Sequence, residues 1–411
     1  MTAVISLSSI LGSQAPRLQA LPPLSLYIHL PWCVKKCPYC DFNSHEARNG
    51  NLPEEDYVAA LIRDLETALP QIWGRKVVSV FFGGGTPSLF SARSIDTILT
   101  AVRTLLPLEH LAEVTLEANP GTVEAQKFAG FRAAGINRLS LGIQSFNPGH
   151  LQALGRIHDG DEARRAVEIA QKNFDNVNLD LMYALPNNAT ENATEQTLDE
   201  ARQDITTAVS YGVPHISAYH LTLEPNTLFH RYPPLLPDDD LAAEMQVMIE
   251  QTLAYSGYVN YETSAFAQPG RESRHNLNYW LFGDYLGIGA GAHSKISFAD
   301  KIIRQMRCKQ PREYLAKTAD AEAPLQEQHE VGRDERGFEF MMNALRLTAG
   351  FATEMFQQRT GLPLTAIQQQ LNEAERCGLI VRDHQRITPT LTGRRFLNDL
   401  LQIFLPEKSK T

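Results

Sequence analysis

Short apolar runs alternate with amphipathic segments along the first half of the chain. The runs predict six strands, over residues 24–30, 77–82, 114–118, 138–143, 177–182 and 215–221. Between them, apolar residues recur at helical spacing, so the intervening segments are predicted to be helices. Six strand–helix units in succession favour parallel strands with right-handed crossovers, and the near-continuous apolar runs indicate a sheet covered on both faces. We therefore expect an α/β fold that curves into a partial barrel, with an open doubly wound sheet as the alternative.

The pattern changes after Glu224. The segment Tyr232-Pro-Pro-Leu-Leu-Pro237 breaks regular structure. From about residue 331 the chain is predicted to be mostly helical, with a small hairpin over 380–388, an order similar to a winged-helix module. Because the chain is acidic and this part has no strong basic stripe, we interpret it as a lid or a docking surface, not a DNA-binding module. Four regions are expected: a loose extension (1–23), a barrel segment (24–235), a segment that completes the barrel (236–310) and a C-terminal domain (311–411).

Composition and charge narrow the classes of function. The 411 residues carry a formal net charge of −9, which argues against a broad nucleic-acid-binding surface. No stretch approaches the roughly 20 continuous apolar residues of a membrane span, and the first residues lack the basic segment of a signal peptide. The five cysteines are too few and too unevenly placed for a secreted disulfide framework. We therefore expect a cytoplasmic protein without a transmembrane segment.

Three of the cysteines, Cys33, Cys37 and Cys40, lie within eight residues, directly after the first predicted strand. Clustered thiolates suit a soft metal or an iron–sulfur cluster. A structural zinc site or a fully ligated cluster would need four ligands. We infer an iron–sulfur cluster that is held by three cysteines and leaves one iron open to another ligand.

Several residues that could bind a ligand follow the carboxyl ends of the predicted strands, where parallel α/β folds gather their functional groups. Gly83-Gly84-Gly85-Thr86 would let the backbone approach a ligand closely, or would simply form a tight turn. Glu117 would hold a ribose diol or an amino group, unless it is a solvated acid. Asp180 lies among apolar residues, and a buried carboxylate needs a partner. It would therefore be either a structural hydrogen-bond hub or a ligand contact. Arg156 would pair with a ligand carboxylate or form a surface ion pair.

The Cys-x3-Cys-x2-Cys spacing and the later Gly-Gly-Gly-Thr-Pro sequence resemble the radical S-adenosylmethionine (SAM) superfamily. Further segments resemble the oxygen-independent coproporphyrinogen III dehydrogenase family: Leu26-Tyr-Ile-His-Leu-Pro-Trp-Cys33, Glu117-Ala-Asn-Pro, Gly142-Ile-Gln-Ser, Gly155-Arg156 and Asp180-Leu-Met-Tyr. The resemblance implies a [4Fe-4S] cluster on the three cysteines. It also implies a SAM that chelates the open iron and is cleaved, on reduction by a partner such as flavodoxin or ferredoxin, to a 5′-deoxyadenosyl radical.

The same resemblance assigns roles to nine residues. Tyr27, Gly84 and Glu117 would contact the SAM on the cluster. The others would face a second SAM, if one binds: Tyr39, Gly85, Thr86, Gln144, Arg156 and Asp180.

Two features distinguish between branches of that family. The dehydrogenase branch has a further cysteine two residues after the triad, where this chain has Phe42. His275-Asn-Leu-Asn-Tyr-Trp280 resembles the His-Asn-x-x-Tyr-Trp motif of the heme chaperone branch, which binds heme and passes it to acceptor proteins. By this resemblance His275 would ligate heme iron through a neutral imidazole nitrogen, although a lone histidine is more often structural.

The other motif residues would complete the heme site: Asn276, Tyr279 and Trp280, with the two aromatic rings stacking on the porphyrin. The favoured function is heme delivery. The alternative is the dehydrogenase reaction, the oxidative decarboxylation of coproporphyrinogen III. A third hypothesis is a structural or regulatory protein that keeps the fold without its chemistry.

The remaining candidates are weaker. His45, His158, His220 and His293 are interpreted mainly as structural, with His220 the best placed to face the pocket because it follows the sixth strand. Arg304, Arg307 and Lys309 form a small basic run, which we interpret as a solvated face and not as a contact for heme propionates or for a partner.

Overall fold

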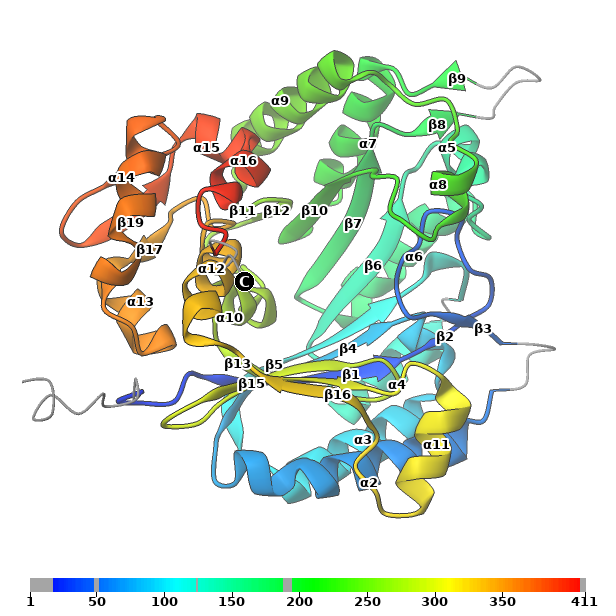
Figure 1. The fold of residues 1–411 in the computed structure, drawn as a ribbon. Helices are drawn as coiled ribbons and strands as arrows, with labels where there is room; N and C mark the ends of the chain where they lie inside the picture. Colours follow the sequence, from blue (N-terminus) through cyan, green and yellow to red (C-terminus); the bar gives the residue numbers. More distant parts are fainter. Residues whose placement is uncertain (1–17, 48–51, 123–124, 188–193, 407–411) are drawn as a thin grey trace, which may run out of the picture.

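The computed structural model describes residues 18–47, 52–122, 125–187 and 194–406, so most of the expected N-terminal extension lies outside the described residues. A curved twelve-stranded sheet dominates the fold (Figure 1). Six of its strands are parallel neighbours in chain order, as predicted. They are β1 (Leu24–Leu30), β4 (Val77–Gly84), β5 (Leu108–Ala118), β6 (Arg138–Gln144), β7 (Val177–Tyr183) and β10 (His215–His220).

Helices connect these strands and cover the outer face of the sheet (Figure 1). Several begin at residues whose side chains accept backbone N–H groups of the first turn: Ser91, Asp159 and Thr197. The connecting helices are α2 (Glu54–Ile72), α3 (Ala92–Leu105), α4 (Ala125–Ala134), α5 (Pro148–Ala153), α6 (Gly160–Asn173) and α7 (Leu198–Ser210).

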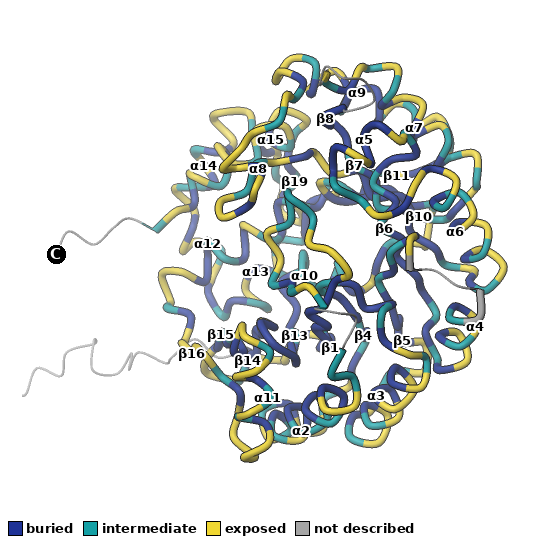
Figure 2. Tube along the Cα trace, turned by 90° about the vertical axis from the view of Figure 1, so that its right-hand side faces the viewer, coloured by how far each residue is buried: buried dark blue, intermediate teal, exposed yellow. Residues whose placement is uncertain are grey.

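The strands are apolar on one face only, contrary to the prediction. In β1, for example, Leu26 and Ile28 pack into the main hydrophobic cluster, whereas Ser25 and Tyr27 carry hydroxyl groups that hydrogen bond away from that cluster. Figure 2 shows the strands buried along most of their length, with exposed residues concentrated on the outer helices and loops. The inner face of the sheet is therefore buried but polar, which suits a ligand better than a second apolar core would.

Further strands extend the sheet at both ends. Beyond β1 come β13 (Asp284–Ile288), β14 (His293–Ser297), β15 (Ile302–Arg307) and β16 (Leu325–Glu330), whereas β12 (Ala265–Ala267) and β11 (Val259–Glu262) follow β10. Among the described residues, β11 and β16 remain the two ends of the sheet. The fold is therefore the expected partial barrel and is not closed.

The basic run does not form a solvated face at Arg307. This side chain is buried and forms an ion pair with Asp64 of α2 at 3.2 Å. Arg304 is also engaged, with Glu339 at 2.7 Å and with the Tyr285 hydroxyl. Lys309 is exposed, as expected. The prediction is wrong for Arg307 because its acidic partner comes from a distant part of the chain.

A short helix, α10 (Arg274–Trp280), lies on the inner face of the sheet and packs against β1, β4 and β13 (Figure 1). Its first turn is held by the buried Glu113 of β5, whose carboxylate accepts the N–H groups of Arg274 and His275 at 3.1 Å each. An acid at a helix N-terminus complements the helix dipole. The predicted heme motif is therefore a fixed part of the barrel interior.

The C-terminal part has its own apolar cluster, in which the ring of Phe340 meets Phe282, Phe351 and Phe356 edge to face. A three-stranded sheet packs with the helices in the expected winged-helix-like order. The elements are α12 (Arg333–Ala344), β17 (Phe351–Ala352), α13 (Thr353–Thr360), α14 (Gln368–Arg376), β18 (Ile380–Arg382), β19 (Arg386–Pro389), α15 (Leu391–Arg395) and α16 (Leu397–Gln402). The four predicted domain boundaries stay predictions.

Three further helices lie outside these groups: α8 (Leu228–Arg231), α9 (Asp239–Tyr255) and α11 (Pro311–Ala319). Of the helices in the described part of the chain, none combines the length and the apolar character that crossing a membrane requires.

Candidate functional site

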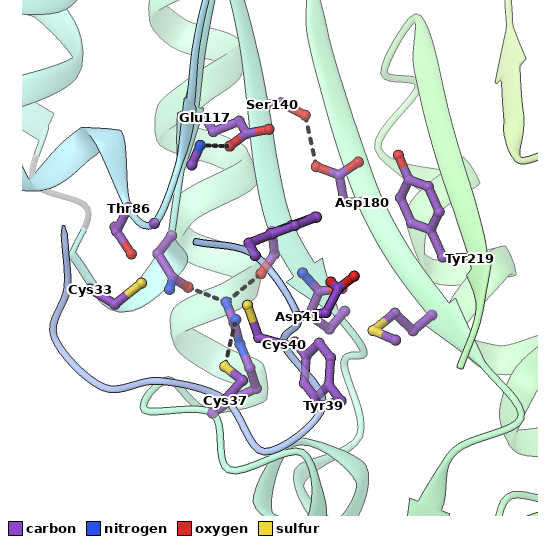
Figure 3. Close-up of a pocket in the computed structure, with 18 of the residues that line it drawn as sticks. Cys33, Cys37, Tyr39, Cys40, Asp41, Thr86, Glu117, Ser140, Asp180 and Tyr219 are labelled. Carbon is purple, nitrogen blue, oxygen red and sulfur yellow. Dashed lines mark hydrogen bonds between the residues drawn. The ribbon is translucent and has the colours of Figure 1, made fainter. Parts of the chain in front are cut away.

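A cavity of about 380 Å³ opens at the carboxyl ends of the parallel strands (Figure 3). The cysteine loop forms one side of it, and Glu117 and Asp180 reach in from the sheet on the other. Its lining includes all three cysteines of the triad and eight of the nine residues predicted to contact SAM, namely Tyr39, Gly84, Gly85, Thr86, Glu117, Gln144, Arg156 and Asp180. Tyr27, the ninth, lines a neighbouring cavity. The residues that were predicted to lie together at the strand ends are thus gathered in the fold. Binding of the cluster or of SAM by these residues stays a prediction.

The cysteine loop is anchored at both of its ends. Cys33 lies on β2 (Trp32–Cys33), which pairs with β3 (His45–Glu46) beyond the loop. Within the loop, the N–H of Cys40 donates to the carbonyl oxygen of Cys37 at 3.1 Å. The three cysteines are free thiols that line one cavity. This arrangement fits a cluster held from one side.

Burial raises the pKa of the Cys33 thiol to about 11 and also raises the pKa of Cys40. Iron binding would therefore have to displace protons from these sulfur atoms. No set of three or more acidic, cysteine or histidine side chains in the described residues could hold a single metal ion. A cluster makes a different demand, because each cysteine binds a different iron and the sulfurs need not converge on one point.

The glycine stretch at the end of β4 is required by packing. A Cβ on Gly84 would lie 2.8 Å from the His29 ring, and one on Gly85 would lie 2.6 Å from the Trp32 carbonyl oxygen. Gly84 also has a φ of +123°, which disfavours other residues. The tight turn and the ligand interpretation are thus both compatible with the structure, since these glycines also line the cavity.

Glu117 and Asp180 are enclosed carboxyl groups and not solvated acids. Burial, with the nearby Asp180 carboxylate as a second cause, raises the pKa of Glu117 to about 8. One oxygen of Glu117 accepts the Gly84 N–H at 3.2 Å. Asp180 accepts hydrogen bonds from Ser140 at 2.7 Å and Asn178 at 2.9 Å, and burial raises its pKa. Asp180 is therefore a hydrogen-bond hub that also faces the cavity.

Arg156 lies against the cysteine loop. Its Nη1 donates to the Cys37 sulfur at 3.5 Å, and its Nη2 donates to the Gly142 carbonyl oxygen at 2.9 Å and to Asn119. Arg156 thus makes these contacts and not the surface ion pair that was the alternative interpretation of this residue. They also hold a positive charge beside a predicted cluster ligand, where it would stabilise a thiolate.

Sequence reasoning missed several cavity residues, among them Asn119, Ser140 and Tyr219. Two of them lie two positions from a residue of a motif named in the sequence: Asn119 from Glu117, and Ser140 from Gly142. The period of two in a strand places such residues on one face. That alternation is the available signal, and it is obscured when the strands are interpreted as near-continuous apolar runs.

His275 is buried within the barrel interior. Its Nδ1 lies 2.9 Å from the Ser79 hydroxyl, and its ring stacks on Phe81 with centroids 4.8 Å apart. Burial, and to a lesser extent Arg138, lowers its pKa to about 3, so the imidazole is neutral. His275 is not among the residues that line the main cavity or its neighbour. Heme ligation by His275 stays a prediction, and it would require the heme iron to reach an enclosed ring.

The structure separates the other heme-motif residues. Tyr279 lines the neighbouring cavity, whereas Asn276 and Trp280 line neither. The Trp280 ring instead lies under the guanidinium of Arg346, with 4.3 Å between the Arg346 Cζ and the ring centroid. Of the motif residues, Tyr279 is therefore the one that lines either of these two cavities.

The four weaker histidine candidates also differ in whether they line one of these cavities. His158 is buried with its Nε2 against the Ile143 carbonyl oxygen, a structural role, and His45 lines neither cavity. His220 lines the main cavity and stacks on Tyr183. His293 lines the neighbouring cavity.

Two family models match the chain. The Radical SAM superfamily model matches residues 27–201, and the HemN C-terminal domain model matches residues 331–396. Heme chaperone HemW of Haemophilus influenzae is 48% identical over 394 residues, which cover 94% of this chain and 99% of that protein. The chain belongs to the HemW heme chaperone family. The HemW proteins of Escherichia coli and Bacillus subtilis are 47% and 33% identical to it over 391 and 390 residues, covering 94% and 93% of this chain and 99% of each relative.

A solved structure shares the fold of this HemW family member. Coproporphyrinogen III oxidase (HemN) from Escherichia coli, described as a radical SAM enzyme, superposes with a TM-score of 0.77. The match covers 95% of this chain and 91% of that chain at 22% sequence identity. At this identity the likeness concerns the fold, which is that of a radical SAM protein with a C-terminal helical region.

Proposed function

We propose that this protein is a heme chaperone that binds a [4Fe-4S] cluster, SAM and heme and transfers heme to acceptor proteins. The observation that carries the proposal is near-full-length similarity, at 48% and 47% identity, to two proteins named heme chaperones. The proposed compartment is the cytoplasm, whose reducing conditions keep thiols free.

The main cavity offers a fitting place for the cluster and for SAM. Cys33, Cys37 and Cys40 would hold the cluster, because they are free thiols lining a single cavity. A reduced cluster would supply an electron to the sulfonium group of SAM. Arg156 would place its guanidinium beside the Cys37 sulfur.

The polar groups on the sheet would orient the ligand. Glu117 would accept a hydrogen bond from the amino group of SAM through the oxygen that is not bound to the Gly84 N–H. Asp180, fixed by Ser140 and Asn178, would accept a bond from a second ligand hydroxyl or amino group. A fixed carboxylate loses little freedom on binding, which favours affinity.

The alternative function is the oxidative decarboxylation of coproporphyrinogen III. It is favoured by the fold shared with HemN and by the cavity that gathers the residues predicted for two SAM molecules. The position two residues after the triad argues against it. There the dehydrogenase branch is expected to have a cysteine, and here the exposed Phe42 lines the cavity.

One experiment tests both functions. The full chain is reconstituted anaerobically with iron and sulfide, titrated with heme and followed by its Soret absorbance. In parallel it receives coproporphyrinogen III, SAM and a reductant. We expect one heme to bind per chain, heme to pass to an apoprotein acceptor and no decarboxylated product to form. Product formation without heme binding would replace the proposal by the alternative, and failure of the wild type to bind heme would refute it.

A further inference from the structure

A second cavity, of about 570 Å³, lies beside the first. The two share the lining residues Cys40, Asp41, Phe42, Gly84 and Glu117, so they meet at the cysteine loop. The volume is within the range of roughly 300–1,000 Å³ that is typical of pockets for ligands of drug size. Of the residues proposed to contact the cluster or the SAM on it, this cavity is lined by Cys40, Tyr27, Gly84 and Glu117, and the rest of its wall has no role in those contacts.

Aromatic rings form one part of its wall. Tyr279 of α10 and Tyr285 of β13 stack with centroids 4.1 Å apart and an interplanar angle of 20°, and both line the cavity. Tyr285 is fixed in turn by Arg304, whose Nη1 donates to the Tyr285 hydroxyl at 2.6 Å. Fixed aromatic surface of this kind suits a flat, largely apolar ring system.

Charged groups lie around these rings. Lys36 and Lys309 are exposed and line the cavity, as do the acids Asp41 and Glu117. Because its pKa is raised to about 8, Glu117 is mostly neutral near pH 7. Two ammonium groups thus stand against the single carboxyl group of Asp41, and this excess of basic groups suits an anionic substituent.

His293, at the start of β14, brings an imidazole to the same cavity. It is exposed and makes no side-chain hydrogen bond to the described residues, and burial of part of the ring together with Lys309 and Arg304 lowers its pKa. The backbone that carries it is well anchored: the preceding turn is bonded through the Gly291 N–H to the Cys308 carbonyl oxygen at 2.9 Å. A neutral, unengaged imidazole on a fixed strand is a ready iron ligand.

His275 contrasts with His293 on each of these points. It is 3% exposed, its Nδ1 is engaged by Ser79, and it packs on Phe81. It is absent from the lining of the second cavity, whereas its motif neighbour Tyr279 is part of it.

We propose that the second cavity receives the porphyrin of the carried heme, with His293 as the iron ligand and Tyr279 against the macrocycle. This inference rests on the proposed heme chaperone function. Lys36 and Lys309 would pair with the propionates. Because Gly84 and Glu117 belong to both cavities, a SAM on the cluster would lie next to the porphyrin, and the two ligands would influence each other's affinity.

The test is heme titration of the reconstituted full chain and of three histidine variants. Soret absorbance gives the affinity, and electron paramagnetic resonance of the ferric heme reports the ligand. His293→Ala is expected to weaken heme binding at least about tenfold, since removing even an outer partner of a metal ligand costs 10- to 100-fold. It should also shift the Soret band, and added imidazole should restore the wild-type spectrum. His384→Ala, at an exposed histidine that lines neither cavity, should behave as wild type.

The outcomes separate the inference from the function on which it rests. If the wild type binds no heme, the proposed function fails. If the wild type binds heme and His293→Ala keeps its affinity and spectrum, the assignment of His293 is wrong. Loss of the heme spectrum in His275→Ala alone, with unchanged cluster content, would return the ligand role to His275.

Discussion

The guanidinium of Arg307 lies 3.2 Å from the carboxylate of Asp64, and both side chains are buried between α2 and the antiparallel end of the sheet. Asp64 also accepts hydrogen bonds from the Tyr314 hydroxyl at 3.0 Å and the Gly289 N–H at 3.2 Å. This acid therefore joins β15, α11 and the glycine-rich turn before β14.

Replacing Arg307 with alanine should destabilise the protein strongly. The change leaves the Asp64 carboxylate buried without its cation, which typically costs about 3–5 kcal/mol of the free energy of unfolding. Denaturant unfolding followed by circular dichroism measures the loss. Arg376→Ala is the matched control, because Arg376 pairs with Glu373 at the surface and its removal should leave the unfolding midpoint nearly unchanged. Equal effects of the two substitutions would contradict the prediction.

Glu117 should make stability depend on pH in an identifiable window. Its pKa is about 8 in the folded chain and near 4.5 without these surroundings. Between these values the folded state holds a proton that the unfolded chain has released, so this group's contribution to stability falls as pH rises from about 4.5 to 8. Glu117→Gln cannot ionise and should gain melting temperature relative to the wild type from pH 5 to pH 8. A difference between the two proteins that stays constant over this range would show that Glu117 does not titrate there.

Asn43 should hold the cysteine loop in place. Its Nδ2 donates to the carbonyl oxygens of Ala290 and Lys309 at 2.9 Å each, and its own carbonyl oxygen lies 2.9 Å from His29 Nε2. Asn43→Ala removes the two side-chain bonds, each contributing about 1 kcal/mol.

We expect the reconstituted Asn43 variant to release iron to a chelator up to about thirtyfold faster than the wild type, since the two lost bonds together contribute about 2 kcal/mol. Asn343→Ala serves as the control, because the Asn343 side chain bonds only within α12, to the Glu339 carbonyl oxygen. Identical release rates for all three proteins would mean that the loop does not depend on this anchor.

The C-terminal apolar cluster should depend on Phe340. Its ring meets three other phenylalanines and is fully buried, so Phe340→Ala should cost about 3–5 kcal/mol of unfolding free energy. Phe396, which is 56% exposed, offers the comparison: Phe396→Ala should cost far less. Calorimetry of both variants measures the two losses of unfolding free energy. Similar losses would show that the C-terminal cluster does not depend on Phe340.

Much of the fold could be predicted from local pattern. The six parallel strands and the cavity at their carboxyl ends follow from the alternation of apolar runs and helices, which depends on neighbouring residues only. The cysteine spacing likewise lies within one loop.

Features that depend on distant partners could not be predicted. Arg307 is interpreted as solvated from its own surroundings, but Asp64 is 243 residues away in the chain. The enclosure of His275, on α10, depends on Ser79 and Phe81 of the distant strand β4. A motif identifies residue types, whereas access to a ring is decided by tertiary packing.

An unclosed sheet leaves two edges where another chain could add a strand and begin aggregation. At one end, β16 carries the exposed side chains of Glu327 and Glu330. At the other, the Tyr261 carbonyl oxygen of β11 accepts the Thr348 N–H at 3.1 Å, so the C-terminal part covers this edge. Charged side chains protect one edge and the C-terminal part covers the other, so the sheet can remain unclosed without becoming a template for β-aggregation.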